Sequence, residues 1–169
     1  TDVTLTNNQG NGSGVVYVTS NCKLTMTNVT ASGNKAYNGG VLYISGSAAV
    51  TVKDSNFTGN TANAYGGAID HRSSGAVTVT NTIFSGNTAA IQGGAINAKG
   101  TGKLTLENCT FDQNRALATK TEAGLICRGG GAIYVSSAAN VTVTGGSFSK
   151  NNAAGTQDVT TAGSEMTDA

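Results

Sequence analysis

The side chains that could carry acid–base chemistry are few in this chain and lie far apart along it. His71 is the only histidine among the 169 residues. Cleavage of a polysaccharide needs two or three carboxylates, or a carboxylate with Arg or Lys, converging on one face. Asp70 with Arg72 comes nearest to such a pair, and we interpret it as a surface salt bridge. No group of His and Cys has the spacing of metal ligands, so we expect no catalytic residue, no cofactor, no metal and hence no enzyme.

The elements that must position these side chains belong to a repeat of two motifs. The first motif is Phe-x-x-Asn and the second is Gly-Gly-Ala-Ile. The Phe positions are 57, 84, 111 and 148, so the intervals are 27, 27 and 37 residues. A period between about 20 and 50 residues is typical of stacked structural units. The motif residues are Phe57, Asn60, Gly66, Gly67, Ala68, Ile69, Phe84, Asn87, Gly93, Gly94, Ala95, Ile96, Phe111, Asn114, Gly130, Gly131, Ala132, Ile133, Phe148 and Asn151.

A third segment of each repeat alternates apolar and polar residues, as in Val77-Thr78-Val79-Thr80. Such alternation is typical of a strand that buries one face. Thr and Val favour strands, while Asn and Gly supply the left-handed backbone of tight corners. We therefore expect three short strands in each repeat, joined by corners. By alternation with Ile69, His71 is expected to point into the core.

The fold that fits these repeats is all-β: a right-handed parallel β-helix, a single-stranded solenoid of about six coils of roughly 27 residues each. Equivalent strands would stack about 4.8 Å apart. The Phe residues would form an internal stack, and each Asn would turn a corner and hydrogen-bond to the neighbouring coils. The paired glycines would let the backbone turn sharply or pass close to its neighbour.

The repeat also predicts the domain organisation. We expect one β-helical domain over residues 1–155 and a polar tail or linker over 156–169. The longest interval contains an insertion within 115–128. This insertion should protrude from a corner as a loop, because corners tolerate added residues and strands do not.

The composition excludes several classes of function. Charged residues make up 11% and the formal net charge is +1, so the chain has no basic surplus with which to hold nucleic acid or an anionic membrane. No apolar run approaches the roughly 20 residues of a membrane-spanning helix. Residues 1–20 have no signal-peptide pattern. We expect any targeting signal or membrane attachment to lie outside this chain.

The two motifs, in shared phase over about residues 1–152, resemble those of the polymorphic membrane proteins of chlamydiae. These are autotransporters whose passenger domains act as surface adhesins, and both motifs are associated with attachment to host cells. The resemblance implies a virulence-related adhesin at the bacterial outer membrane or cell surface, retained there or released. It implies a host receptor protein or glycan as partner. The chain departs from the pattern at Ala31 and at 39–42.

We expect the exposed faces of the β-helix and the loop within 115–128 to contact a partner. If the Phe and Asn of the motifs point inward, they cannot touch a receptor, so we predict an architectural role for them. An outward column one residue past the motif Ile contains tyrosines, which give a large contact area at low entropic cost. Partly buried corner tyrosines are the alternative interpretation. The candidate contact residues are Tyr17, Tyr43, Tyr134, Arg115, Lys120 and Arg128.

Three other functions fit parts of the pattern. The chain could be a structural stalk that holds another adhesive region away from the membrane. It could be a polysaccharide-active enzyme, since parallel β-helices host such enzymes, although its carboxylates fall in different columns of the repeat. Its outward Thr columns resemble those of ice-binding solenoids, but Lys53 and Glu107 interrupt them.

The cysteines are odd in number, so at least one thiol has no partner within a monomer. Cys22 lies more than three coils from Cys109, too far for a disulfide bond. Cys109 could pair with Cys127 if the insertion folds back, or both could be free. The family resemblance implies an envelope with disulfide cross-links, and hence self-association or a disulfide-linked oligomer formed through Cys127.

Overall fold

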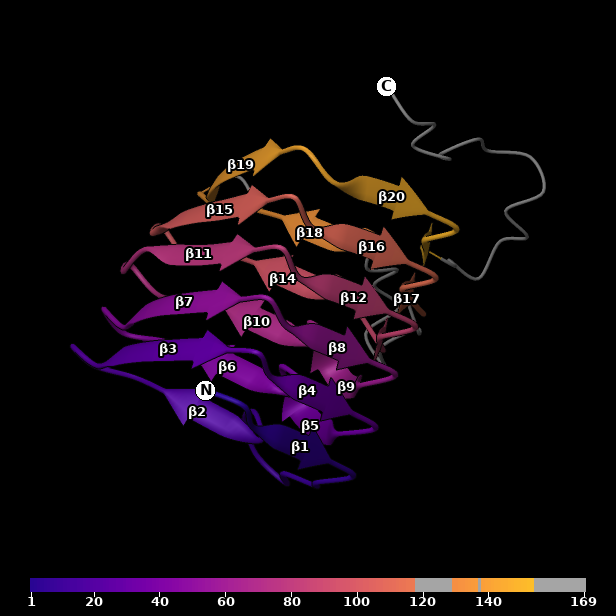
Figure 1. The fold of residues 1–169 in the computed structure, drawn as a ribbon, viewed down its shortest axis with the longest axis horizontal. Helices are drawn as coiled ribbons and strands as arrows, with labels where there is room; N and C mark the ends of the chain where they lie inside the picture. Colours follow the sequence, from indigo (N-terminus) through magenta and orange to yellow (C-terminus); the bar gives the residue numbers. More distant parts are fainter. Residues whose placement is uncertain (118–128, 137, 154–169) are drawn as a thin grey trace, which may run out of the picture.

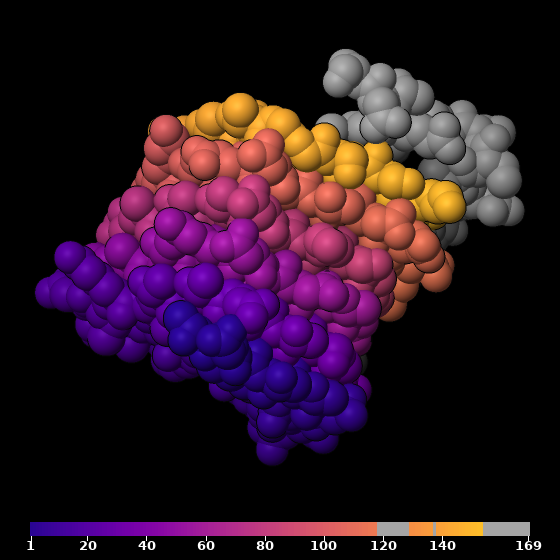
Figure 2. All heavy atoms as spheres, in the orientation of Figure 1, coloured from indigo at the N-terminus to yellow at the C-terminus, as the bar shows by residue number. Residues whose placement is uncertain are grey.

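The computed structural model describes residues 1–117, 129–136 and 138–153. These residues form short strands joined by corners, and none of them belongs to a helix that could cross a membrane. The coils stack in sequence order from the N-terminal end, so the colours run steadily along the stack (Figure 1). They appear as parallel bands on the face seen in Figure 2. The predicted parallel β-helix is confirmed.

Four parallel sheets form the walls of the coil. The Phe sheet consists of β1 (Thr4–Thr6), β4 (Thr30–Ser32), β8 (Asn56–Thr58), β12 (Ile83–Ser85), β16 (Thr110–Asp112) and β20 (Ser147–Ser149). The Ala sheet consists of β5 (Lys35–Asn38), β9 (Thr61–Tyr65), β13 (Thr88–Ala89), β17 (Arg115–Ala116) and β21 (Asn152–Ala153). The Tyr sheet consists of β2 (Val16–Val18), β6 (Leu42–Ile44), β10 (Ile69–His71), β14 (Ile96–Ala98) and β18 (Ile133–Val135). The Thr sheet consists of β3 (Lys23–Thr27), β7 (Ala49–Lys53), β11 (Val77–Thr80), β15 (Lys103–Glu107) and β19 (Asn140–Thr144).

The prediction of three strands in each repeat is wrong, because the segment after each Asn corner pairs with the next coil as the Ala sheet. The estimate of six coils is slightly too high. Four coils, from β4 to β19, have a strand in every sheet, and partial coils flank them. An Ala-sheet strand can be as short as two residues, as in β13, which leaves no alternation to read in the sequence.

A stack of aromatic rings runs through the interior. Phe57, Phe84 and Phe111 have no exposed surface. Their ring centroids lie 5.2 and 4.9 Å apart, and Phe148 continues the stack at 4.7 Å from Phe111. Burial of each ring contributes about 1.5–3 kcal/mol. Ala31 pairs in register with Phe57 and takes the equivalent core position one coil below.

The motif asparagines form a continuous amide ladder beside this stack. The side-chain amide of Asn60 donates to the Oδ1 atom of Asn87 at 2.9 Å and to the carbonyl oxygen of Ala31 at 3.0 Å. The backbone amide of Asn60 donates to the same Oδ1 atom at 3.0 Å. The corresponding bonds recur at Asn34, Asn87 and Asn114. Each corner is thereby tied to the coils on both sides.

The two glycines of the second motif have different tasks. Gly66 and Gly93 adopt left-handed backbone, with φ of 63° and 66°, which favours a residue without Cβ. A Cβ on the following residue, Gly67, would overlap the carbonyl oxygen of Gly94 in the next coil. The first glycine therefore turns the chain into the Tyr sheet, and the second allows neighbouring backbones to pass closely.

The domain limits drawn from the repeat stay a prediction. The insertion follows β17 and precedes β18, so the described residues place it between the Ala sheet and the Tyr sheet. Most of it, and the tail predicted for 156–169, lie outside the described residues.

Candidate functional site

The outer face of the Tyr sheet gathers the most varied set of side chains among the described residues. One column of this face aligns a residue from each of five strands in parallel register. Two residues further along each strand, a second column contributes Arg72 and Lys99, and Tyr65 reaches the same face from the end of β9. The first column consists of Tyr17, Tyr43, Asp70, Asn97 and Tyr134.

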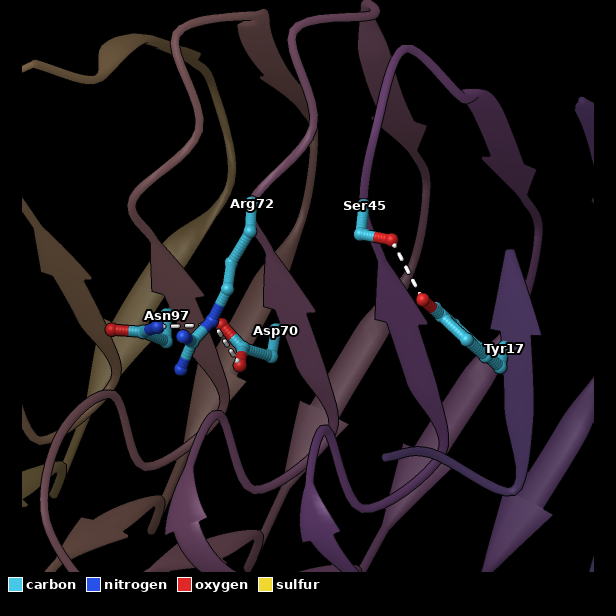
Figure 3. Close-up of polar contacts among 5 residues, drawn as sticks. All are labelled: Tyr17, Ser45, Asp70, Arg72 and Asn97. Atoms are coloured by element: carbon cyan, nitrogen blue, oxygen red, sulfur yellow. Dashed lines mark hydrogen bonds and ion pairs between the residues drawn. The ribbon is translucent and has the colours of Figure 1, made fainter. Parts of the chain in front are cut away.

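A buried carboxylate lies at the centre of this face. Asp70 has no exposed surface, although its column faces outward. The Nε atom of Arg72 donates to Asp70 Oδ2 at 2.9 Å, and the side-chain amide of Asn97 donates to Asp70 Oδ1 at 2.6 Å (Figure 3). The Arg72 side chain is 32% exposed. Arg72 therefore covers the carboxylate on one side and meets solvent on the other.

The cations and the aromatic rings alternate across the coils. The guanidinium carbon of Arg72 lies 5.0 Å from the ring centroid of Tyr65 and 5.8 Å from that of Tyr43. The ammonium nitrogen of Lys99 lies 4.2 Å from the Tyr65 centroid and 5.7 Å from that of Tyr134. These distances are those of cation–π contacts. The ring of Tyr65 therefore contacts both cations.

Tyr17 extends this row of contacts toward the N-terminal end. Its ring centroid lies 5.2 Å from that of Tyr43, with the planes tilted by 59°. The hydroxyl of Ser45 donates to the hydroxyl oxygen of Tyr17 at 3.1 Å (Figure 3). We call the connected set of side chains the Tyr–Arg–Lys strip; its members are Tyr17, Tyr43, Tyr65, Arg72, Lys99 and Tyr134.

The electrostatics of the strip follow from burial. Burial raises the pKa of Asp70 above its ordinary value of 3.8, and the charges of Arg72 and Lys99 together with the hydrogen bonds from Asn97 and Arg72 offset part of this effect. Burial likewise raises the pKa of Tyr43, whereas the hydrogen bond from Ser45 lowers the pKa of Tyr17. The buried carboxylate holds Arg72 in place, and the two cations give the strip a net positive charge.

Several buried polar atoms on or beside this face have no hydrogen-bond partner. They are Arg72 Nη2, Asn97 Oδ1, Gln92 Oε1 and Asn38 Oδ1. Asn38, Tyr65 and Gln92 occupy equivalent positions in successive coils, since Asn38 pairs with Tyr65 and Tyr65 bridges to Gln92. Buried polar groups are usually paired, but these four atoms are enclosed, so a ligand on the surface does not reach them in this conformation.

The structure corrects the interpretation of Asp70 with Arg72 as a surface salt bridge, because the carboxylate is fully buried and also bonded to Asn97. The sequence reasoning did not name Tyr65, Arg72 or Lys99 among the contact residues. Position alone could have pointed to Tyr65, which directly precedes the glycine pair of its coil. His71 lies in the core as expected, where its Nε2 atom is 3.0 Å from the carbonyl oxygen of Gly102.

The other candidate contact residues are dispersed. Tyr17 is exposed at 57%, and Tyr43 and Tyr134 are half-buried. Arg115 is exposed on β17, in a different sheet from the strip. Lys120 and Arg128 lie outside the described residues.

The motif residues lie mainly inside the coil or at its corners, away from the surface that a receptor could reach. Phe57, Asn60, Phe84, Asn87, Phe111 and Asn114 have no exposed surface, and Phe148 and Asn151 at the last described coil are half-buried. The Ala and Ile of the second motifs are buried as well, except for the half-buried Ile133.

No group of three or more His, Cys, Asp or Glu side chains among the described residues could hold a metal ion. Asp54 and Glu107 are exposed at the ends of Thr-sheet strands, whereas Asp70 lies in the Tyr sheet. Cys22 is an exposed free thiol and Cys109 a buried one, and Cys127 lies outside the described residues. The described geometry thus offers a polar, aromatic binding surface with one carboxylate that is already bonded.

Comparison with known proteins agrees with this architecture. No curated protein and no solved structure matches the chain. A family model described as the right-handed β-helix region matches residues 1–168, nearly the whole sequence. The chain belongs to the right-handed β-helix family.

Proposed function

We propose that the chain is a passenger segment of an autotransporter adhesin, of the polymorphic membrane protein type, that attaches to host cells through the Tyr–Arg–Lys strip. The observation that carries this proposal is the strip itself, a continuous row of ring and cation contacts from Tyr17 to Tyr134 that Tyr65 of the Ala sheet completes. Tyr and Arg are the residues most enriched at binding hot spots. The protein acts at the bacterial outer membrane or cell surface, and membrane attachment comes from a part outside this chain.

The two motifs serve this function indirectly in our proposal. Because Phe84 and Asn87 have no exposed surface, they hold the coils in register and so align the strip. A motif substitution should then abolish attachment by unfolding a coil. A variant with unchanged circular dichroism and melting temperature that no longer binds cells would contradict this assignment.

Binding is proposed without catalysis. The strip covers a single carboxylate, that of the buried Asp70, whose oxygens already accept hydrogen bonds from Arg72 and Asn97. Acid–base cleavage of a glycosidic bond uses a pair of carboxylates that flank the bond. Incubation with pectin, alginate and glycosaminoglycans should yield no new reducing ends and no unsaturated products.

Attachment can be tested with the chain coated on beads. Coated beads should bind host cells, and beads coated with an inert protein of similar size should not. Deletion of 116–127 separates the two proposed contact zones: binding that survives belongs to the strip, and binding that disappears belongs to the insertion. Failure of the intact chain to bind any host cell would leave the stalk as the better function.

The stalk is favoured by a different observation. The amide ladder runs from Asn8 to Asn151 without a break, so the Asn corner of each described coil is tied to that of its neighbours. A rod braced in this way suits a spacer that holds an adhesive region away from the membrane. The bead assay discriminates the two functions, because a spacer alone does not attach.

A further inference from the structure

The strip combines two cations with planar rings in one row. Arg72 and Lys99 follow one another in neighbouring coils, so their backbones lie about 4.8 Å apart along the stack. Tyr65 lies between them, and Tyr43 and Tyr134 flank the pair. The row therefore runs along the axis of the solenoid and suits an elongated ligand.

Each part of the row matches a group found on acidic sugars. A planar guanidinium binds carboxylate or sulfate oxygens through two parallel hydrogen bonds. Arg72 donates its Nε–H to Asp70, while its side chain remains 32% exposed. Tyr rings offer flat surfaces to the C–H faces of sugar rings, and their hydroxyls can bond to sugar hydroxyls.

We propose that the Tyr–Arg–Lys strip binds an anionic saccharide chain, with Arg72 and Lys99 contacting its carboxylate or sulfate groups and the tyrosines supporting its rings. This inference rests on the proposed function and names the class of partner that the same surface recognises. Asp70 is a positioning residue for this site, because it fixes the guanidinium from beneath.

Other polyanions fit the strip less well. Nucleic acid is disfavoured because the whole chain carries a net charge of only +1. A peptide partner usually inserts apolar anchors into a pocket, whereas the side chains of this strip are aromatic or polar throughout. A short acidic peptide is accordingly a useful competitor for the test.

The direct test measures binding of the intact chain by titration calorimetry to three oligosaccharides of equal length: one sulfated, one built of uronates and one neutral. The first or the second should bind and the neutral one should not, which also identifies the anionic group. Arg72→Gln and Lys99→Gln should each weaken binding about tenfold, the effect of losing one charge-assisted hydrogen bond. Lys53→Gln and Lys103→Gln remove exposed cations from the Thr sheet and should change affinity less than twofold, roughly within what screened surface charges contribute.

Several results would overturn the proposal. These are absence of binding to both acidic oligosaccharides, equal losses in the Thr-sheet controls, or equally tight binding of an acidic peptide. If Arg72→Gln lowers the melting temperature by removing the partner of Asp70, the comparison of Lys99→Gln with the Thr-sheet controls decides, because Lys99 lies over the rings of Tyr65 and Tyr134.

The same variants separate this inference from the proposed function. Beads coated with the chain are applied to host cells before and after enzymatic removal of acidic glycans. If attachment is unchanged by both the treatment and the variants, the saccharide assignment fails while adhesion stands. If the chain binds the acidic oligosaccharide but no cells, adhesion fails while the saccharide site stands.

Discussion

Truncation of one rung of the amide ladder should cost far more inside the rod than at its end. Asn87→Ala removes a side chain that makes four hydrogen bonds, two as donor and two as acceptor. The carbonyl of Phe57, the backbone amide of Asn60 and the side-chain amide of Asn60 then each lose a buried partner. At about 1–3 kcal/mol for each such group, the free energy of unfolding should fall by roughly 3–9 kcal/mol.

Asn8→Ala is the matched control, because the same side chain is removed from an exposed end of the ladder. Asn8 donates one side-chain hydrogen bond to Asn34 Oδ1, which keeps the backbone amide of Asn8 as a donor. The expected loss is about 0.5–1.5 kcal/mol, the net value of a single hydrogen bond.

Urea unfolding followed by circular dichroism measures both losses, with the slope of the transition used to check that the extent of unfolding is unchanged. Equal losses for Asn87→Ala and Asn8→Ala would refute the reasoning. That result would mean that the ladder follows the strand pairing without adding stability of its own.

Three further outcomes can be measured on the same chain. Phe84→Ala should lower the free energy of unfolding by about 3–5 kcal/mol in urea, since it opens a cavity between two stacked rings, and Phe148→Ala at the half-buried end should cost less. The raised pKa of Asp70 means that the folded state binds a proton more readily than the unfolded state. The free energy of unfolding of the wild type should therefore rise relative to that of Asp70→Asn as the pH falls through the raised pKa toward 3.8. A difference between the two proteins that does not change with pH would contradict this. The lowered pKa of His71 has the opposite sign, so the wild type should lose stability relative to His71→Gln as the pH falls below 6.5, and parallel pH profiles in thermal unfolding would argue against it.

The fold could be predicted from the sequence because a solenoid repeats its constraints. Phe, Asn and Gly recur at a fixed interval, and each recurrence points to the same place in the coil. The Ala sheet escaped prediction for a physical reason: β13, β17 and β21 have only two residues each, too few to show a periodic pattern.

The site was predicted less well than the fold. The register of the Tyr column followed from alternation, but the burial of Asp70 did not, because it depends on Arg72 and Asn97 closing over it. Tyr65 reaches the face from another sheet, and only the packing of the corner brings it between Arg72 and Lys99. Contacts between columns depend on side-chain directions that a one-dimensional pattern does not contain.

The hydrogen-bond distances of the amide ladder stay the same where the number of residues between successive asparagines changes. The backbone amide of Asn87 lies 3.0 Å from Asn114 Oδ1 across 27 residues, and that of Asn114 lies 3.0 Å from Asn151 Oδ1 across 37 residues. The rung thus closes in the same way across 27 residues and across 37. The segment of sequence between β17 and β18 is accordingly a suitable insertion point, where a foreign epitope could be grafted while the scaffold on either side retains its geometry.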